Sequence, residues 1–174
     1  MTNFAGFPVP VAIHRIANAP NRKRAWEFFV FFSRFEYALK RDSRYLKPGN
    51  GDAQADWDRF AREQNSAFLQ DASTTLQTAV DYYVAHPPRK QLRSNGQMGW
   101  SDPLDWNGTD LKFIWLLRAV RTVRNNLFHG GKFPQLPVEE SSRDLDLITN
   151  GLVLLDGALE LDHEVRDVFL DGLE

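Results

Sequence analysis

Apolar residues recur at helical intervals along most of the chain. The first such stretch, residues 21–46, has Asn21 in a position to cap a helix, and it carries apolar residues at i, i+4, i+7 and i+11: Phe28, Phe32, Phe35 and Leu39. Three neighbouring aromatic residues widen this stripe: Trp26, Phe29 and Phe31. The pattern predicts a long helix that is buried on more than one side.

Four further stretches show the same period. The second begins near Ala53 and places in phase Trp57, Phe60, Gln64 and Phe68. The third, ended by "HPPRK", aligns Leu76, Val80 and Tyr83. The fourth, from Thr109 or Asp110 to about Phe128, has a core stripe of Phe113, Leu116, Leu117, Val120, Val123 and Leu127. These periods predict three more helices.

The fifth stretch begins at "SSRD", where Ser141 and Asp144 have the spacing of a capping box. Its apolar residues repeat as Leu145, Ile148, Leu152, Leu155 and Leu159. Residues 89–110 are rich in turn formers and predict a long loop, and residues 1–20 predict an irregular N-terminus. With no alternating strand pattern, the expected fold is all-α, a bundle of four or five helices in a single domain over residues 1–174.

Composition narrows the class of protein. The 174 residues are 43% hydrophobic, enough for one domain with a core, and they include no cysteine, which excludes disulfides and thiolate metal sites. The longest strongly apolar run, residues 28–32, is too short to span a bilayer, and prolines interrupt the N-terminus where a signal peptide needs an apolar stretch. We therefore expect a soluble, cytoplasmic protein with no membrane association.

Charge is segregated along the chain although the net charge is only −2. Residues 21–47 hold eight Lys/Arg against three acids, residues 111–138 hold five against none, and residues 139–174 hold two against eleven. The two basic segments are able to form one face that attracts phosphates. The alternative is that they are ordinary solvated helix faces.

The stretch "RTVRNNLFHGGKF", residues 121–133, concentrates polar groups at the predicted end of the fourth helix. On a helix, Asn125 and Asn126 lie one turn before His129, whereas Arg124 lies about 140° around from it. The helix C-terminus favours the charged imidazolium and the nearby arginines oppose it, so His129 is expected to titrate near neutral pH.

Several kinds of functional site are excluded because the residues that they require are absent. "GGK" at residues 130–132 lacks the remaining residues of a phosphate-binding loop, the four histidines are too scattered for a zinc site, and no nucleophile elbow occurs. The residues that remain as candidates for catalysis in this stretch are Arg, Asn and His. They suit the cleavage of a phosphodiester, because His can transfer protons and Arg can bind the phosphate anion. We expect neither a metal nor a cofactor.

The block "RNNLFH", Arg124 to His129, resembles the R-x4-H signature of the HEPN superfamily (higher eukaryotes and prokaryotes nucleotide-binding), including Asn directly after the Arg. Its position near the end of the penultimate long helix of a small helical chain, after an early aromatic helix, fits these bundles. The order of the predicted helices resembles that of the family over most of the chain. Similarity at the level of individual residues is limited to this block.

Catalytic HEPN proteins are metal-independent ribonucleases that work as dimers and are often toxins or defence effectors. The resemblance therefore implies an endoribonuclease that cleaves RNA by attack of the 2′-OH, with a composite site at a homodimer interface and an antitoxin or other regulatory protein as a further partner. A two-fold dimer supplies the second histidine that one chain lacks.

On this hypothesis His129 is the general acid/base, Arg124 the phosphate clamp, and Asn125 orients His129 or the substrate. Asn126 and Glu36 are supporting residues, Glu36 by resemblance to an acidic residue on an early helix of some HEPN proteins. Its alternative role is an i, i+4 ion pair with Lys40.

Three more cations are candidates for binding the RNA backbone: Arg118, Arg121 and Lys132. Their alternative role is solubility. For the motif as a whole, the alternative is a HEPN-like module that binds nucleotides or proteins without cleaving them, because a fold does not settle a function.

Overall fold

The computed structural model describes residues 22–70, 72–94, 96–128 and 138–173. These residues form six helices and one two-stranded antiparallel sheet: α2 (Arg22–Arg41), α3 (Trp57–Gln70), α4 (Thr74–Ala85), β1 (Arg89–Ser94), β2 (Gln97–Pro103), α5 (Lys112–Phe128), α6 (Val138–Leu159) and α7 (His163–Leu170). The described part of the chain is thus mostly helical, as the sequence predicts.

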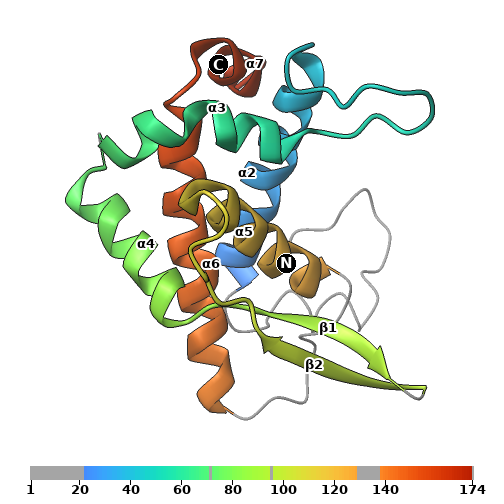
Figure 1. Ribbon diagram of the computed structural model, residues 1–174, viewed down its shortest axis with the longest axis vertical. Coiled ribbons are helices and arrows are strands. Elements are labelled where there is room, and N and C mark those ends of the chain that lie inside the picture. Colours follow the sequence, from blue (N-terminus) through green and yellow to red (C-terminus); the bar gives the residue numbers. More distant parts are fainter. Residues whose placement is uncertain (1–21, 71, 95, 129–137, 174) are drawn as a thin grey trace, which may run out of the picture.

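The helices pack in a bundle around α6. α2 and α4 both contact α6, α3 packs on α5, and α7 lies against α2 (Figure 1). α5 also contacts α2, α4 and α6, so it lies inside this arrangement. α5, which carries the start of the predicted motif, is therefore held by its neighbours on several sides.

An aromatic cluster joins α2, α3 and α5. The ring of Phe32 stacks on Trp57 with 5.0 Å between centroids, and Phe35 meets Phe60 edge to face at 5.5 Å. Phe68 stacks on Phe113 at 3.9 Å. Most members of the predicted stripes of these three helices are buried in one hydrophobic core, whereas Gln64 and Leu127 are only half-buried. Trp26, which was expected to widen the α2 stripe, is 63% exposed, so the prediction that α2 is buried on that side is wrong.

Local signals explain where several helices begin and end. The Ser73 hydroxyl accepts a hydrogen bond from the Leu76 amide at 3.2 Å and caps α4. α4 then ends before Pro87 and Pro88, which cannot continue a helix. The Asp162 carboxylate caps α7 in the same way, by accepting from an amide in its first turn.

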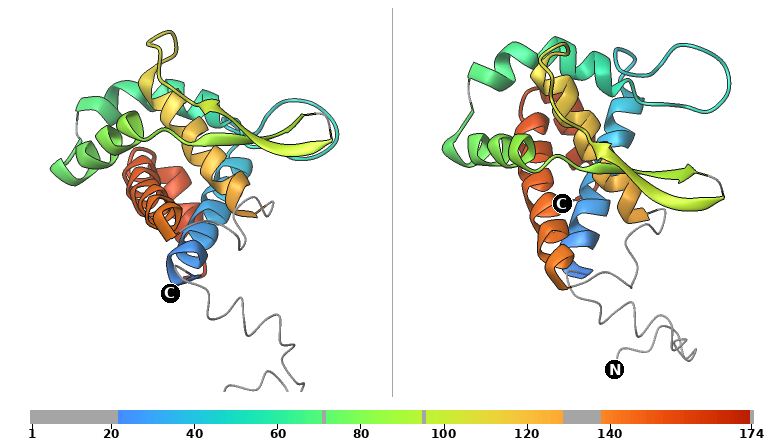
Figure 2. Two further views of the ribbon diagram at one scale, coloured as in Figure 1. Left: turned by 90° about the horizontal axis from the view of Figure 1, so that it is seen from below. Right: turned by 60° about the horizontal axis from the view of Figure 1, so that its bottom comes forward.

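The region 89–110 differs from the predicted loop, because β1 and β2 form a hairpin within it. Gln91 pairs with Trp100 and Arg93 pairs with Met98, and the turn includes Gly96 with a φ of 79°. The hairpin projects to one side of the helices (Figure 2). Its apolar residues are exposed rather than packed in a core, so the sequence lacks the apolar alternation that identifies most strands.

In the second half of the chain, two predicted helix boundaries change and one helix is added. α5 begins at Lys112 rather than at residue 109 or 110. α6 begins at Val138, so Ser141 lies inside the helix and the predicted capping box there is wrong. A sixth helix, α7, follows α6 and was not predicted, which raises the count in the described residues above four or five.

The acidic C-terminal segment is bound to α2 and the turn that follows it. The Arg34 guanidinium donates to the carbonyl oxygens of Phe169 at 2.8 Å and Asp171 at 2.6 Å. The Arg44 guanidinium lies 3.1 Å from the Asp162 carboxylate and 3.0 Å from Glu164. Two cations of the first basic segment therefore hold α7 in place.

Candidate functional site

α5 carries the motif residues around its last two turns. The helix forms because its apolar residues repeat at helical spacing, and eight of its apolar residues are buried: Phe113, Ile114, Trp115, Leu116, Leu117, Ala119, Val120 and Val123. Most of its polar side chains lie in its second half. Arg124 and Asn126 are two residues apart and so project about 200° from one another around the helix.

The Arg124 side chain is directed toward α2. Its guanidinium carbon lies 5.3 Å from the centre of the Phe32 ring, a cation–π contact. Its Nη2 lies 4.0 Å from Oε2 of Glu36, and its Nη1 donates to Oδ1 of Asn125 at 3.1 Å. With 32% of its side chain exposed, Arg124 is positioned by protein contacts and still reaches solvent.

The Glu36 carboxylate faces two cations at once. One oxygen lies 3.0 Å from Nζ of Lys40 and the other faces Arg124. Glu36 therefore makes the ion pair within the helix and also lies beside Arg124, while its supporting role in the motif stays a prediction. The shorter distance makes Lys40 its closer partner.

The two asparagines take different positions. Asn125 is exposed and lines a hollow of about 260 Å³ together with Lys90, Gln91 and Thr122. Asn126 is only 7% exposed, and its Nδ2 donates to the carbonyl of Arg89 at 2.7 Å. This bond ties β1 to α5, so the structure places the Asn126 side chain against the hairpin.

His129 and Lys132 lie outside the described residues, as does Gly130, which the sequence places at the end of the helix. The roles predicted for His129 and Lys132 remain predictions from sequence.

Arg118 and Arg121 lie one helical turn apart and share one acid. Nη2 of Arg118 lies 2.6 Å from Oδ2 of Asp58 at the start of α3, and Nη1 of Arg121 lies 3.6 Å from Oδ1 of the same carboxylate. Nη1 of Arg118 also lies 2.6 Å from Asp110. Both candidates for RNA binding are thus ion-paired and would have to exchange a carboxylate for a phosphate.

The electrostatics of Asp58 follow from these contacts. Burial raises the pKa of its carboxyl group, but the hydrogen bonds from Arg118 and the charges of Arg118 and Arg121 outweigh it, so the pKa lies below its ordinary value. Asp58 is consequently ionised at neutral pH and neutralises part of the basic segment of α5.

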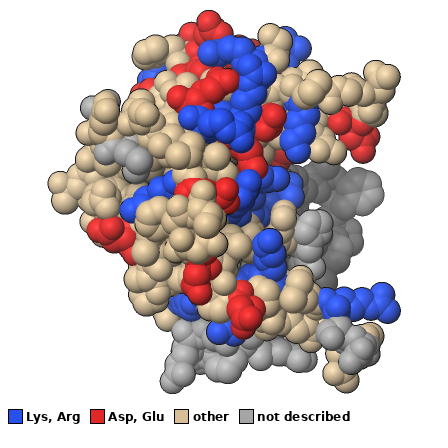
Figure 3. Space-filling model, viewed as in Figure 1, with Lys and Arg blue, Asp and Glu red and all other residues tan. Residues whose placement is uncertain are grey.

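Residues 111–138 have no acid in sequence, yet each of the three arginines on α5 has one in space. The acids come from α2, from α3 and from the segment before α5. On the face shown in Figure 3, Lys and Arg side chains alternate with Asp and Glu instead of forming an unbroken basic patch. The predicted phosphate-attracting face is therefore partly neutralised by the fold.

Sequence reasoning missed Phe32 and Asp58 as neighbours of the motif, and it missed Lys90 and Gln91 beside Asn125. Phe32 was recognised as a core residue, but nothing in the sequence shows that its ring lies under Arg124. A signal for the hairpin did exist, because Asn-Gly at residues 95–96 is typical of two-residue hairpin turns.

In the described part of the chain, no three His, Asp or Glu side chains are grouped so that they could hold a metal ion. Each helix in this part of the chain is too short or too polar to cross a bilayer.

Comparison with protein-family models, with curated proteins and with solved structures finds no match to this chain.

Proposed function

We propose that this chain is a metal-independent endoribonuclease of HEPN type. The observation that supports the proposal best is the position of Arg124, which Phe32 and Glu36 hold at the end of α5, five residues before His129 in the sequence. A partly exposed guanidinium in a fixed position suits the binding of a phosphate whose negative charge grows during reaction.

The proposed reaction is a transesterification within the RNA strand. A base removes the proton of a ribose 2′-OH, the 2′ oxygen bonds to the adjacent phosphorus, and the bond to the 5′ oxygen breaks as an acid protonates that oxygen. The products are a 2′,3′-cyclic phosphate and a 5′-hydroxyl end. His129 supplies the proton transfers, and Arg124 stabilises the phosphorane by its positive charge.

One chain offers a single suitable histidine, and the reaction needs both a base and an acid. A homodimer that brings two copies of α5 together would supply both, along with two Arg124 side chains. Light scattering on the purified chain tests this part of the proposal: a dimer is expected, and a monomer that still cleaves RNA would contradict the composite site.

Cleavage itself is tested on a single-stranded RNA in the presence of EDTA. The wild-type chain should cleave, whereas His129→Ala and Arg124→Ala should each lower the rate by about 100-fold or more. Arg62→Ala, which removes an exposed arginine from α3, serves as the matched control and should cleave as the wild type does. An unaltered rate for His129→Ala would overturn the proposal, provided that melting shows all three variants to be folded.

A second candidate, a module that binds nucleotides without cleaving them, is favoured by one observation. A cavity on the other side of α5 is lined by arginines and a tryptophan. A chain that binds RNA or nucleotides but cleaves no RNA in EDTA would support this second candidate over the first.

A further inference from the structure

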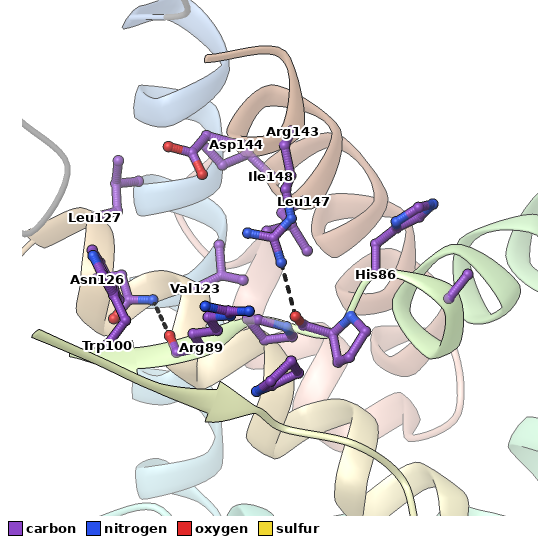
Figure 4. A pocket seen from close by; sticks show the side chains of 14 residues that line it. His86, Arg89, Trp100, Val123, Asn126, Leu127, Arg143, Asp144, Leu147 and Ile148 are labelled. Atoms are coloured by element: carbon purple, nitrogen blue, oxygen red, sulfur yellow. Dashed lines mark hydrogen bonds between the residues drawn. The ribbon is translucent and has the colours of Figure 1, made fainter. Parts of the chain in front are cut away.

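A cavity of about 430 Å³ opens between the hairpin, the end of α4, α5 and the first turns of α6 (Figure 4). Its volume is within the range of about 300–1,000 Å³ that is usual for small-ligand sites. It lies on the side of α5 where Asn126 meets β1, whereas Arg124 faces α2. The cavity is thus distinct from the Arg124 site but belongs to the same end of the same helix.

The lining of the cavity combines an aromatic ring, apolar side chains and cations. Trp100 of β2 is 40% exposed, and Val123, Leu127 and Ile148 provide an apolar wall. Arg89 and Arg143 bring guanidinium groups to the same space (Figure 4). A partly exposed indole that lines the same cavity as two guanidinium groups suits a ligand that joins a flat base to a phosphate.

Arg89 differs from the arginines of α5 in its surroundings. Across the described ranges of the chain, its guanidinium makes no hydrogen bond or ion pair, although Arg118, Arg121 and Arg124 each face a carboxylate. Arg143 donates one N–H to the carbonyl of Pro87 at 2.9 Å, and within the described residues its other guanidinium N–H groups make no hydrogen bond. Asp144 also lines the cavity, so the lining includes two arginines and one acid.

Protein contacts build this cavity without any ligand. The Asn126 amide holds the carbonyl of Arg89, Arg143 holds that of Pro87, and the Leu104 amide donates to the carbonyl of Pro88 at 2.9 Å. The start of β1 is therefore fixed to α5, to α6 and to the segment after β2. Because these residues are already held in place, little free energy is lost to ordering them when a ligand binds.

We infer that the cavity holds one nucleotide of a single-stranded RNA, with its base against Trp100 and its phosphate at Arg89 and Arg143. The assignment of RNA as the ligand rests on the proposed function. The cavity would then position the strand next to the end of α5 and so help to select which phosphate reaches the Arg124 site. Stacking on an aromatic ring accepts any base, so a modest preference is expected rather than a strict sequence requirement.

The test uses a fluorescently labelled 2′-O-methyl single-stranded RNA, which lacks the attacking hydroxyl and cannot be cleaved by the proposed reaction. Fluorescence anisotropy then reports binding separately from catalysis. Trp100→Ala and Arg89→Gln should each weaken binding about tenfold. The matched controls Trp106→Ala and Arg62→Gln change an exposed tryptophan and an exposed arginine outside the cavity, and should bind as the wild type does.

The outcomes separate this inference from the proposed function. Equal binding by Trp100→Ala, Arg89→Gln and the wild type would overturn the inference, as would no binding by the wild type, even if ordinary RNA is still cleaved. Equally strong binding of a free mononucleotide, shown by competition, would overturn the assignment of a strand. Weakened binding by both variants, together with no cleavage of ordinary RNA by the wild type, would support the cavity and overturn the ribonuclease proposal.

Discussion

Glu36 on α2 and Arg124 on α5 face each other with 4.0 Å between Oε2 and Nη2. The pair joins residues that are far apart in the sequence and connects the early aromatic helix to the predicted motif. Because Lys40 lies closer to the same carboxylate, at 3.0 Å, the Glu36 charge is shared between a neighbour on its own helix and the proposed phosphate clamp. The contacts of Glu36 with Arg124 and with Lys40 can therefore be tested by separate substitutions.

Glu36→Gln should lower the rate of RNA cleavage about tenfold, because Arg124 loses one of the groups that orient it. Lys40→Gln, the matched control, removes the other partner of the carboxylate and should leave the rate within about twofold. Single-turnover cleavage of one RNA by both variants measures the difference. Equal losses in the two variants would show that Glu36 acts through its ion pair with Lys40 and not through Arg124.

Asp58 should contribute to stability in a pH-dependent way. Asp58→Asn is expected to cost about 1 kcal/mol at pH 7, a value reduced by solvent screening because a third of the side chain is exposed. The folded-state pKa of Asp58 is lowered, so this contribution is complete above the unfolded-state pKa of about 3.9 and is lost as pH falls through the folded-state pKa.

Urea unfolding between pH 7 and pH 2.5 measures this effect. Asp110→Asn is the matched control, because Asp110 is the other partner of Arg118 and is 48% exposed, and it should cost only a few tenths of a kcal/mol. A difference between the wild type and Asp58→Asn that persists at pH 2.5 would contradict the assignment to this carboxylate.

The same substitution tests whether Arg118 and Arg121 bind RNA. Without the Asp58 charge, Arg121 and the Arg118 donors that Asp110 does not hold would be available to phosphates, so binding of the 2′-O-methyl strand should strengthen and become more dependent on salt. Two added phosphate contacts would steepen the slope of log K against log salt by about 1.4. Anisotropy titrations between 50 and 200 mM salt give that slope.

Asp81→Asn controls for net charge in this experiment, because it removes one exposed acid from α4 whose carboxylate accepts from Gln77 of the same helix. It should leave the slope near that of the wild type. If Asp58→Asn and Asp81→Asn give the same slope, the two arginines serve the fold through Asp58 and take no part in RNA binding.

The parts of this structure that follow local rules were predictable from sequence. The apolar stripes of α2 and α5 are the clearest case, since every third or fourth residue is buried. The hairpin was missed because Leu92, Met98 and Trp100 are exposed, so no apolar face identifies the strands. The ion pairs of Asp58 with Arg118 and Arg121 were missed for another reason: Asp58 precedes α5 by more than fifty residues, and no pattern along the chain links it to that helix. Glu36 was a candidate only through the family resemblance.

The position of Gly151 in α6 reflects the closeness of three helices. A Cβ atom there would lie 2.7 Å from the Tyr83 hydroxyl of α4 and 3.0 Å from the Phe28 ring of α2. The Tyr83 hydroxyl donates to the carbonyl of Leu147 at 2.8 Å, and burial raises the pKa of this phenol, so it stays protonated and keeps donating. The helices can approach this closely only because residue 151 has no side chain.

Gly151→Ala should therefore destabilise the protein by about 1–3 kcal/mol, although alanine is the better helix former by about 1 kcal/mol. Gly157→Ala in the same helix is the matched control: its Cβ would meet only the flexible end of Leu76, so its cost should be smaller. Urea unfolding of the two variants and of Gly151→Ala in a Tyr83→Phe background measures these costs. Removing the hydroxyl should reduce the penalty at residue 151 by about 1 kcal/mol, and an undiminished penalty would place the clash at Phe28 instead.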